Sequence, residues 1–238
     1  MMNKTFYFKQ FQVTHQYSTM KVGTDAVLLG AITDIGNSGN ILEVGTGCGV
    51  IALMLAQRCK AFIHAIDIDA QSVEEANKNF EKSPWQERLL AEPIALQDFT
   101  AQTHFRFDLI ISNPPFFTNS LKNPDRSKAR ARHNDNLSFK TLIAESAYLL
   151  NPHGKLALIA PASEEQNLLD IAKNNDLMPC RMVRILPRED KSPNRIVLEF
   201  EKHKTSKSIT SGNISIRNPG GEYSPTYIAL LKDFLLYF

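Results

Sequence analysis

The chain has 238 residues, of which 43% are hydrophobic, and a formal net charge of +2 at pH 7. This length allows one α/β core with a small appendage and is too short for two full domains, and the near-neutral charge singles out no class of partner. Because no apolar run approaches the roughly 20 residues of a membrane-spanning helix, and because Lys4 and Lys9 interrupt the N-terminus, we expect neither a membrane anchor nor a signal peptide.

The first half of the chain predicts helices that alternate with short apolar strands. Residues 21–25 are predicted to form a polar turn before an apolar helix from Ala26, with Thr24 or Asp25 as its cap. Asp69 is predicted to cap a helix that follows the second strand. The predicted strands are Asn40–Gly45, Ala61–Asp67, Arg88–Ala95 and Phe107–Ser112, with a helix at about Val50–Arg58 after the first of them.

The second half continues this alternation and then changes at its end. Two strands, Arg181–Pro187 and Arg195–Glu201, are separated only by a short polar loop, so they should pair as an antiparallel hairpin. We therefore predict an α/β fold: a doubly wound, mostly parallel, seven-stranded sheet with a C-terminal antiparallel hairpin. The remaining predicted elements are helices at Phe139–Leu150 and Ser163–Asn174, a strand at Lys155–Ala160, a polar, mobile stretch at Lys202–Asn213 and an amphipathic helix at Ser224–Tyr237.

A glycine-rich turn, Glu43-Val44-Gly45-Thr46-Gly47-Cys48-Gly49, lies between a predicted strand and a predicted helix. Ligands of open α/β sheets bind beyond the carboxyl ends of the strands, and glycines there let the main chain approach a ligand closely. The dinucleotide-binding fingerprint needs Gly or Ala at the position of Val50, and Glu43 would repel a pyrophosphate. A carboxylate at Glu43 would instead attract an ammonium group, such as that of a methionine moiety. This pattern disfavours a dinucleotide-dependent oxidoreductase.

Acidic residues after the second and third predicted strands complete a candidate nucleoside site. Asp67 ends the second strand, where a carboxylate that binds ribose hydroxyls belongs, and Asp69 is a rival whose role as a helix cap is sufficient. Asp98 follows the third strand and could accept a hydrogen bond from the amino group of a cofactor adenine, with Phe99 lining the pocket. Together with the glycine turn, these residues favour a nucleoside cofactor over a plain connecting turn.

The tetrapeptide Asn113-Pro114-Pro115-Phe116 follows the fourth predicted strand and precedes a second aromatic residue, Phe117. A chain stop would explain the two prolines, but it would need neither the asparagine nor the aromatic pair. Methylation of an exocyclic purine amine would need these features. The side-chain oxygen of Asn113 and the carbonyl of Pro114 can accept the two N–H bonds and direct the nitrogen lone pair at a methyl group. Phe116 can stack on the base.

The glycine turn, Asp67 and the Asn-Pro-Pro-aromatic tetrapeptide resemble those of class I S-adenosylmethionine-dependent amino-methyltransferases. Phe8-Lys9-Gln10-Phe11 and Met20-Lys21-Val22-Gly23-Thr24-Asp25 make the sequence similar to one group among them, the bacterial tRNA1(Val) (adenine(37)-N6)-methyltransferases, over nearly the whole chain. The resemblance implies S-adenosylmethionine as the cofactor and methylation of the adenine beside the anticodon of a valine tRNA. It also implies that Lys21, Gly23, Thr24 and Asp25 close over the methionine end of the cofactor.

By the same resemblance, residues 1–238 form a single methyltransferase domain, with a cofactor-closing segment at 1–35, a core at 36–201, and a polar loop and C-terminal helix at 202–238. Phe116 stands where the family often has tyrosine, and phenylalanine is also frequent in enzymes that methylate guanine in ribosomal RNA. The alternatives of the same class are therefore an rRNA guanine-N2 methyltransferase and a protein-glutamine N5 methyltransferase. A non-catalytic RNA-binding protein would require neither Asn113 nor the acidic residues.

Basic side chains soon after the tetrapeptide are expected to hold the RNA. They would rim the pocket and contact backbone phosphates, which positions the RNA without reading its sequence, while a loop base is splayed out into the pocket. A second basic stretch between Arg181 and Arg195 could add to this footprint, although a solvent-facing strand explains it nearly as well. The predicted phosphate contacts are Arg126, Lys128, Arg130 and Arg132.

The three cysteines give no sign of a metal site or a disulfide. Cys48, Cys59 and Cys180 are odd in number and share no spacing typical of either. We therefore expect reduced thiols, no metal, and a cytoplasmic protein.

Overall fold

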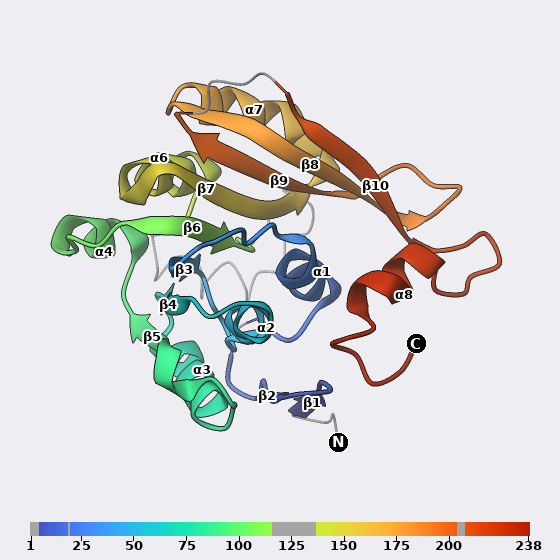
Figure 1. Ribbon diagram of the computed structural model, residues 1–238, viewed down its shortest axis with the longest axis horizontal. Coiled ribbons are helices and arrows are strands. Elements are labelled where there is room, and N and C mark those ends of the chain that lie inside the picture. The colour runs from blue at the N-terminus through green and yellow to red at the C-terminus, as the bar shows by residue number, and fades with distance from the viewer. Residues whose placement is uncertain (1–4, 19, 116–136, 204–207) are drawn as a thin grey trace, which may run out of the picture.

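A mixed eight-stranded sheet carries the fold in the computed structural model, which describes residues 5–18, 20–115, 137–203 and 208–238 (Figure 1). Five adjacent strands run parallel to one another, and the strand that begins at Arg195 pairs antiparallel on both sides, with a further parallel pair beyond it. The predicted mostly parallel sheet with a C-terminal antiparallel hairpin is therefore confirmed. The strands are β3 (Asn40–Val44), β4 (Phe62–Asp67), β5 (Leu89–Pro93), β6 (Phe107–Ser112), β7 (Leu150–Pro161), β8 (Leu177–Arg188), β9 (Arg195–Lys202) and β10 (Thr210–Arg217), in the spatial order β10-β8-β9-β7-β6-β3-β4-β5.

The prediction of seven strands was one short, because β10 adds an edge strand. It pairs parallel with β8, and its first residues lie in the segment that we expected to be mobile. Ile214 and Ile216 are half-buried and pack against the core, but the polar residues around them hide this from a reading of composition. The terminal helix α8 (Pro225–Leu231) is also shorter than predicted, and Ser224 caps it by accepting a hydrogen bond from the Tyr227 N–H at 3.1 Å.

Helices cover both faces of the sheet, and each face has its own buried cluster (Figure 1). Leu28 and Leu53 belong to one cluster, and Leu142 and Leu158 belong to the other. Because the parallel strands share one direction, the residues that follow β3, β4 and β6 come together at one edge of the sheet. Helices α1 (Thr24–Ile32), α2 (Val50–Arg58), α3 (Ala70–Glu81) and α8 cover the first face, and α4 (Leu96–Gln102), α6 (Phe139–Leu149) and α7 (Glu165–Lys173) cover the second.

Two short strands at the N-terminus were not predicted. β1 (Thr5–Tyr7) and β2 (Gln12–Thr14) form an antiparallel hairpin, which is too short to show a clear period of two in the sequence. Phe8 beyond β1 bridges to Leu235 near the C-terminus. The hairpin therefore lies beside the C-terminal residues, and its second strand ends at helix α3 near the site described below.

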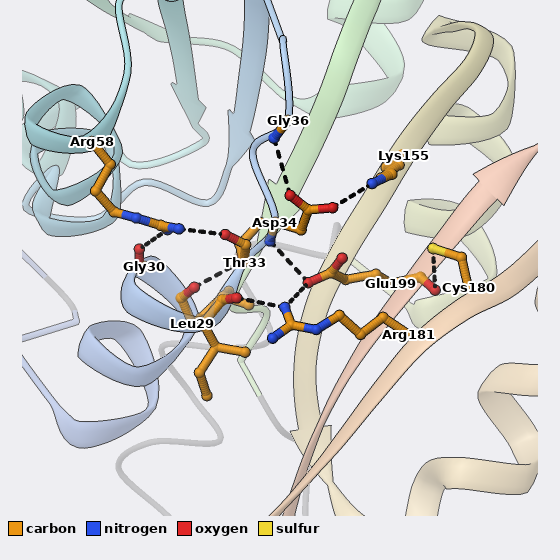
Figure 2. Close-up of polar contacts among 11 residues, drawn as sticks. Leu29, Gly30, Thr33, Asp34, Gly36, Arg58, Lys155, Cys180, Arg181 and Glu199 are labelled. Atoms are coloured by element: carbon orange, nitrogen blue, oxygen red, sulfur yellow. Dashed lines mark hydrogen bonds and ion pairs between the residues drawn. The ribbon is translucent and has the colours of Figure 1, made fainter. Parts of the chain in front are cut away.

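Helix α1 is fixed at its C-terminal end by two arginines from other elements (Figure 2). The last carbonyls of a helix have no partner within the helix and need donors from elsewhere. Arg58 of α2 donates to the carbonyls of Gly30 and Thr33 at 2.7 and 2.8 Å. Arg181 of β8 donates to the carbonyl of Ile32 at 2.6 Å. Hydrogen bonds at the C-terminal end of α1 thus fix the position of this helix, whose first turn reaches the candidate site.

A chain of charges continues from this helix end into the sheet (Figure 2). The buried carboxylate of Glu199 in β9 pairs with Arg181 at 2.8 Å and accepts a hydrogen bond from the Asp34 N–H at 3.0 Å. Asp34 in turn pairs with Lys155 of β7 at 2.7 Å. Burial raises the pKa of Glu199, whereas the hydrogen bond from Lys155 lowers the pKa of Asp34. The network joins the end of α1 to three strands.

Candidate active site

The glycine turn between β3 and α2 has a backbone that glycine adopts without strain. Gly45, Gly47 and Gly49 have φ angles of 76°, 54° and 80°, all in the left-handed region. At Gly49 a Cβ would also lie 2.5 Å from Cε1 of Phe80 in α3, which is closer than two carbon atoms can approach. The spacing of the glycines in the sequence therefore follows from the shape of the turn.

Glu43 is buried at the base of this turn. Its Oε2 accepts hydrogen bonds from the Thr46 hydroxyl at 2.8 Å and from the Ala52 N–H at 3.1 Å. Its Oε1 is buried and has no hydrogen-bond partner within the described part of the chain. Burial raises the pKa of Glu43 to about 8. A donor or a cation placed beside Oε1 would satisfy this oxygen and favour the ionised form.

Asp67 ends β4 and joins that strand to the glycine turn. One carboxylate oxygen accepts a hydrogen bond from the Gly47 N–H at 2.8 Å, and the other accepts from the Asp69 N–H at 2.9 Å. Burial raises the pKa of Asp67. Asp69 is the N-cap of α3 and accepts from the Ser72 N–H at 3.1 Å, as predicted. The two aspartates therefore have separate tasks, and Asp67 is the one beside the turn.

Asn113 and Pro114 follow β6 at the same edge of the sheet. The Ser112 hydroxyl donates to the Val44 carbonyl at 2.8 Å and so fixes the end of β6 against β3. The Asn113 Oδ1 atom is buried and has no hydrogen-bond partner among the residues that the structure describes. A buried amide oxygen without a donor is costly, so Asn113 presents an acceptor that a ligand would satisfy. Phe116, Phe117, Arg126, Lys128, Arg130 and Arg132 lie outside the described residues.

One cavity of about 410 Å³ brings several of the predicted residues together. Asn113 lines it together with Gly45 and Cys48 of the glycine turn. Burial of the Cys48 thiol raises its pKa to about 12. The lining from the N-terminal segment contains the predicted Lys21, Gly23, Thr24 and Asp25 together with Met20 and Ala26, and the remaining lining residues are Thr46, Val50, Ile51 and Arg195.

The start of α1 differs in one respect from the prediction. Neither Thr24 nor Asp25 caps the helix, since Gly23 holds the cap position and makes no side-chain hydrogen bond. Asp25 lies in the first turn and pairs with Nε of Arg195 at 2.8 Å. The sequence reasoning missed Arg195 as a cavity residue. Because β9 runs antiparallel to β7, its first residue lies at the carboxyl edge of the sheet, and the predicted hairpin could have revealed this.

Asp98 and Phe99 do not line this cavity. Both belong to the unpredicted helix α4, where Asp98 is exposed in the first turn. Phe99 is 4% exposed and packs edge-on against His64 and near Phe107 in the second buried cluster. The ring of Phe99 packs in the core there. The predicted Glu43, Gly47, Gly49 and Asp67 are likewise not among the residues that line the cavity.

The arginines between residues 181 and 195 are largely engaged in ion pairs. Arg181 pairs with Glu199, as described, and Arg184 pairs with Glu165 of α7 at 2.5 Å. Arg188 and Asp190 pair at 2.5 Å on the surface. These pairs favour a structural role for this stretch over an RNA footprint.

The family of this chain follows from its sequence relatives. Residues 15–174 match the methyltransferase small domain family. The chain is 44% identical over 236 residues to the tRNA1(Val) (adenine(37)-N6)-methyltransferase of Phocaeicola vulgatus, and 41% identical over 236 residues to that of Parabacteroides distasonis, with 99% of each chain covered in both cases. The chain belongs to this methyltransferase family. Membership in the family rules against the oxidoreductase and the non-catalytic RNA-binding protein.

Solved structures with little sequence similarity share the fold. A protein described as a predicted O-methyltransferase from Agrobacterium tumefaciens has a TM-score of 0.68 at 16% identity and covers 90% of this chain and 98% of its own. A methyltransferase from Pyrococcus furiosus has a TM-score of 0.57 at 20% identity, with 81% and 90% covered. The class I methyltransferase fold is therefore the architecture of this chain.

S-adenosylmethionine is the methyl donor of this enzyme class, and the residues of the glycine turn and its neighbours fit it, although Glu43 and Asp67 do not themselves line the cavity. The unpaired Glu43 Oε1 lies buried at the base of the turn, where an ammonium group would satisfy it. The glycine turn leaves open the space that a Cβ on Gly45 would fill, since no atom lies within 4 Å of that position. Asp67 stands at the end of the adjacent strand, as ribose recognition requires.

The described residues contain neither a cluster of metal ligands nor a membrane-spanning helix. Within the described ranges no three or more His, Cys, Asp and Glu residues are grouped so that they could hold a metal ion. In the same part of the chain no helix is both long and apolar enough to cross a membrane.

Proposed function

We propose that this methyltransferase transfers a methyl group from S-adenosylmethionine to the exocyclic N6 of adenine 37 in tRNA1(Val). Its relatives from Phocaeicola vulgatus and Parabacteroides distasonis carry this activity in their names and match the chain from end to end. A soluble enzyme of the cytoplasm, acting as one domain over residues 1–238, would meet this substrate.

The observation that carries the proposal is the buried, unpaired Oδ1 of Asn113 beside the cavity. The amine of adenine is a poor nucleophile because the ring delocalises its lone pair. Asn113 Oδ1 would accept one amine N–H and the Pro114 carbonyl the other, so that the nitrogen becomes more tetrahedral and its lone pair points toward the donor. S-adenosylmethionine supplies the electrophilic methyl group. The contribution of the chain is orientation and stabilisation of the changing charge, without a strong base before attack.

The remaining residues divide between the cofactor and the RNA. We propose that Glu43, the three glycines of the turn and Asp67 hold the cofactor, with Lys21, Gly23, Thr24 and Asp25 closing over its methionine end. Phe116 would stack on the adenine, and Phe117 would extend this surface. The basic residues Arg126, Lys128, Arg130 and Arg132 would contact the phosphates of the anticodon stem-loop.

Labelled S-adenosylmethionine and total tRNA from a strain that lacks this enzyme test the proposal. We expect label in N6-methyladenosine at position 37 of tRNA1(Val), and we expect Asn113→Ala to abolish it while leaving cofactor affinity in place. Asn40→Ala, at the exposed start of β3, is the matched control and should retain activity. If tRNA stays unlabelled, and label appears instead in N2-methylguanosine when ribosomal RNA is supplied or in glutamine when a protein is supplied, the assignment of the substrate is refuted.

The proposed RNA contacts have a test of their own. Replacing Arg126, Lys128, Arg130 and Arg132 by alanine together should weaken tRNA binding and flatten its dependence on salt, because fewer counterions are then released. Affinity and salt slope equal to those of the unchanged protein would contradict this role.

A further inference from the structure

The N-terminal strap, defined here as residues 14–18 and 20–23, lies between helix α3 and the glycine turn. Its front residues Met20, Lys21 and Gly23 line the cavity. The Cβ of Met20 and the hydroxyl of Ser18 each lie 3.3 Å from the position that a Cβ on Gly47 would occupy. The strap therefore rests directly on the glycine turn, and whatever holds the strap also shapes the cavity.

The rear of the strap is held by one buried carboxylate. Glu75 of α3 is 4% exposed and accepts hydrogen bonds from three consecutive N–H groups, those of Gln16 at 2.6 Å, Tyr17 at 3.1 Å and Ser18 at 2.8 Å. Consecutive N–H groups that converge on one anion form a nest, and charge-assisted bonds of this kind are roughly twice as strong as neutral ones. The adjacent Glu74 instead faces solvent and pairs with Lys78. The strap thus takes its curvature from Glu75.

A second side chain on the same face of α3 ties the strap to the glycine turn. Asn79 lies four residues after Glu75, and residues at this spacing are neighbours on a helix. Its amide nitrogen donates to the Thr14 carbonyl at 2.8 Å and to the Cys48 carbonyl at 2.9 Å, and its oxygen accepts from the Thr14 N–H at 2.9 Å. Asn79 is 2% exposed. Both polar atoms of the Asn79 amide therefore make hydrogen bonds, and one of these bonds goes to Cys48 in the glycine turn.

Bonds within the strap transmit this anchoring to the residues that line the cavity. The Ser18 hydroxyl donates to the Met20 carbonyl at 2.7 Å, and the Val22 N–H donates to Nδ1 of His15 at 3.2 Å. The anchored rear and the cavity-lining front are therefore one hydrogen-bonded unit.

We propose that Glu75 and Asn79 are positioning residues that set the affinity for the cofactor by holding the strap on the glycine turn. They act through Met20, Lys21 and Gly23 and touch neither the cofactor nor the reacting atoms. The same β4–α3 unit supplies Asp67, so one rigid element would present the ribose carboxylate and also fix the strap. The proposal rests on the cofactor site proposed above.

Glu75→Gln tests the proposal, because an amide keeps one acceptor oxygen and turns a donor toward the N–H groups of the nest. We expect the Kd for S-adenosylhomocysteine, measured by calorimetry without RNA, to rise about tenfold or more. Hydrogen exchange at the amides of Gln16, Tyr17 and Ser18 should become faster. Glu74→Gln is the matched control on the same helix, and both quantities should stay as in the unchanged protein.

Ser18→Ala is a second variant that leaves α3 and the core intact. It removes the bonds between the hydroxyl and Met20, and we expect the Kd to rise about threefold. If Glu75→Gln does not fold, this variant decides the test. Faster exchange in the strap with a Kd within about twofold of the unchanged value would overturn the proposal. Failure of the unchanged protein to bind S-adenosylhomocysteine would instead overturn the cofactor site, and the proposal with it.

Discussion

The glycine turn and the N-terminal strap meet at one cavity but depend on different parts of the sequence. The turn needs positive φ at Gly45, Gly47 and Gly49, a requirement that each position meets by itself. The strap depends on bonds to Glu75 and Asn79, which lie 57 to 65 residues further along the chain. A local backbone requirement restricts the residue type and is visible in sequence, whereas a distant hydrogen bond is not. Substitutions in the turn should act through strain, and substitutions at the strap through lost hydrogen bonds.

The largest effect is expected for Gly49→Ala. The new Cβ would lie 2.5 Å from the Phe80 ring, and the alanine backbone would have to keep a φ of 80°. The free energy of unfolding should therefore fall by about 4 kcal/mol. Gly36→Ala is the matched control, because Gly36 also has a positive φ but no atom within 4 Å of its Cβ position. Gly36→Ala should lower the free energy of unfolding by about 1 kcal/mol, as measured by chemical denaturation. Equal losses for both variants would mean that contact with Phe80 adds nothing.

A pH-dependent loss of stability should come from Glu43 at the base of the turn. Burial raises the pKa of this carboxyl from its ordinary value near 4.5 to about 8, so between these values the folded protein binds more protons than the unfolded chain. The free energy of unfolding should therefore fall as pH rises through this range, on the order of 3 kcal/mol. Denaturation curves should show a clearly smaller fall in Glu43→Gln, in which the carboxyls of Glu199 and Asp67 still have pKa values raised by burial. An unchanged slope in that variant would contradict the raised pKa.

A smaller effect is expected for Asn79→Ala at the strap. The variant leaves the Thr14 N–H and the Cys48 carbonyl without their partner and should cost about 2 kcal/mol. Asn77→Ala is matched to it, because Asn77 on the same helix bonds both backbone groups of Ala91 in β5. Both variants should lose stability, but only Asn79→Ala should speed hydrogen exchange in residues 14–18. Equally fast exchange of these amides in both variants would mean that Asn79 does not hold the strap.

The smallest effect is expected for His15→Ala, which removes only the acceptor of the Val22 N–H. Unfolding should become easier by about 1 kcal/mol or less, and the Kd for S-adenosylhomocysteine should rise by no more than about fivefold. Calorimetry measures the Kd, and chemical denaturation measures the free energy of unfolding. The exposed His104 offers the control, and His104→Ala should change neither. A larger effect than that of Asn79→Ala would move the main anchor of the strap from α3 to His15.

Much of the fold could be predicted because its signals are local. The apolar run that ends at Ser112 gave β6 with the bounds of the structure, and Asp69 serves as the cap that its position before a helix indicates. Parallel strands then bring Gly45 and Asn113 to one cavity without further information, because their carboxyl ends share an edge.

The rest depends on contacts that sequence patterns do not record. β10 is polar on its exposed side and owes its place to the pairing with β8. Asp98 and Phe99 were predicted at the cofactor from their place after the third strand alone, and that reading did not foresee that α4 begins there and packs Phe99 in the core. Arg195 and the anchors of the strap became visible only once distant elements were placed beside each other.

Cys48 has a consequence for how this enzyme withstands oxidants. Cys48 is among the residues that line the cavity, and because burial raises the pKa of its thiol to about 12, the thiol stays neutral at physiological pH. Peroxides and alkylating agents react with the thiolate form of cysteine. Cys48, whose modification would block the cavity, stays in the unreactive neutral thiol form. Oxidative damage should fall first on the partly exposed Cys59 and Cys180, neither of which lines the cavity.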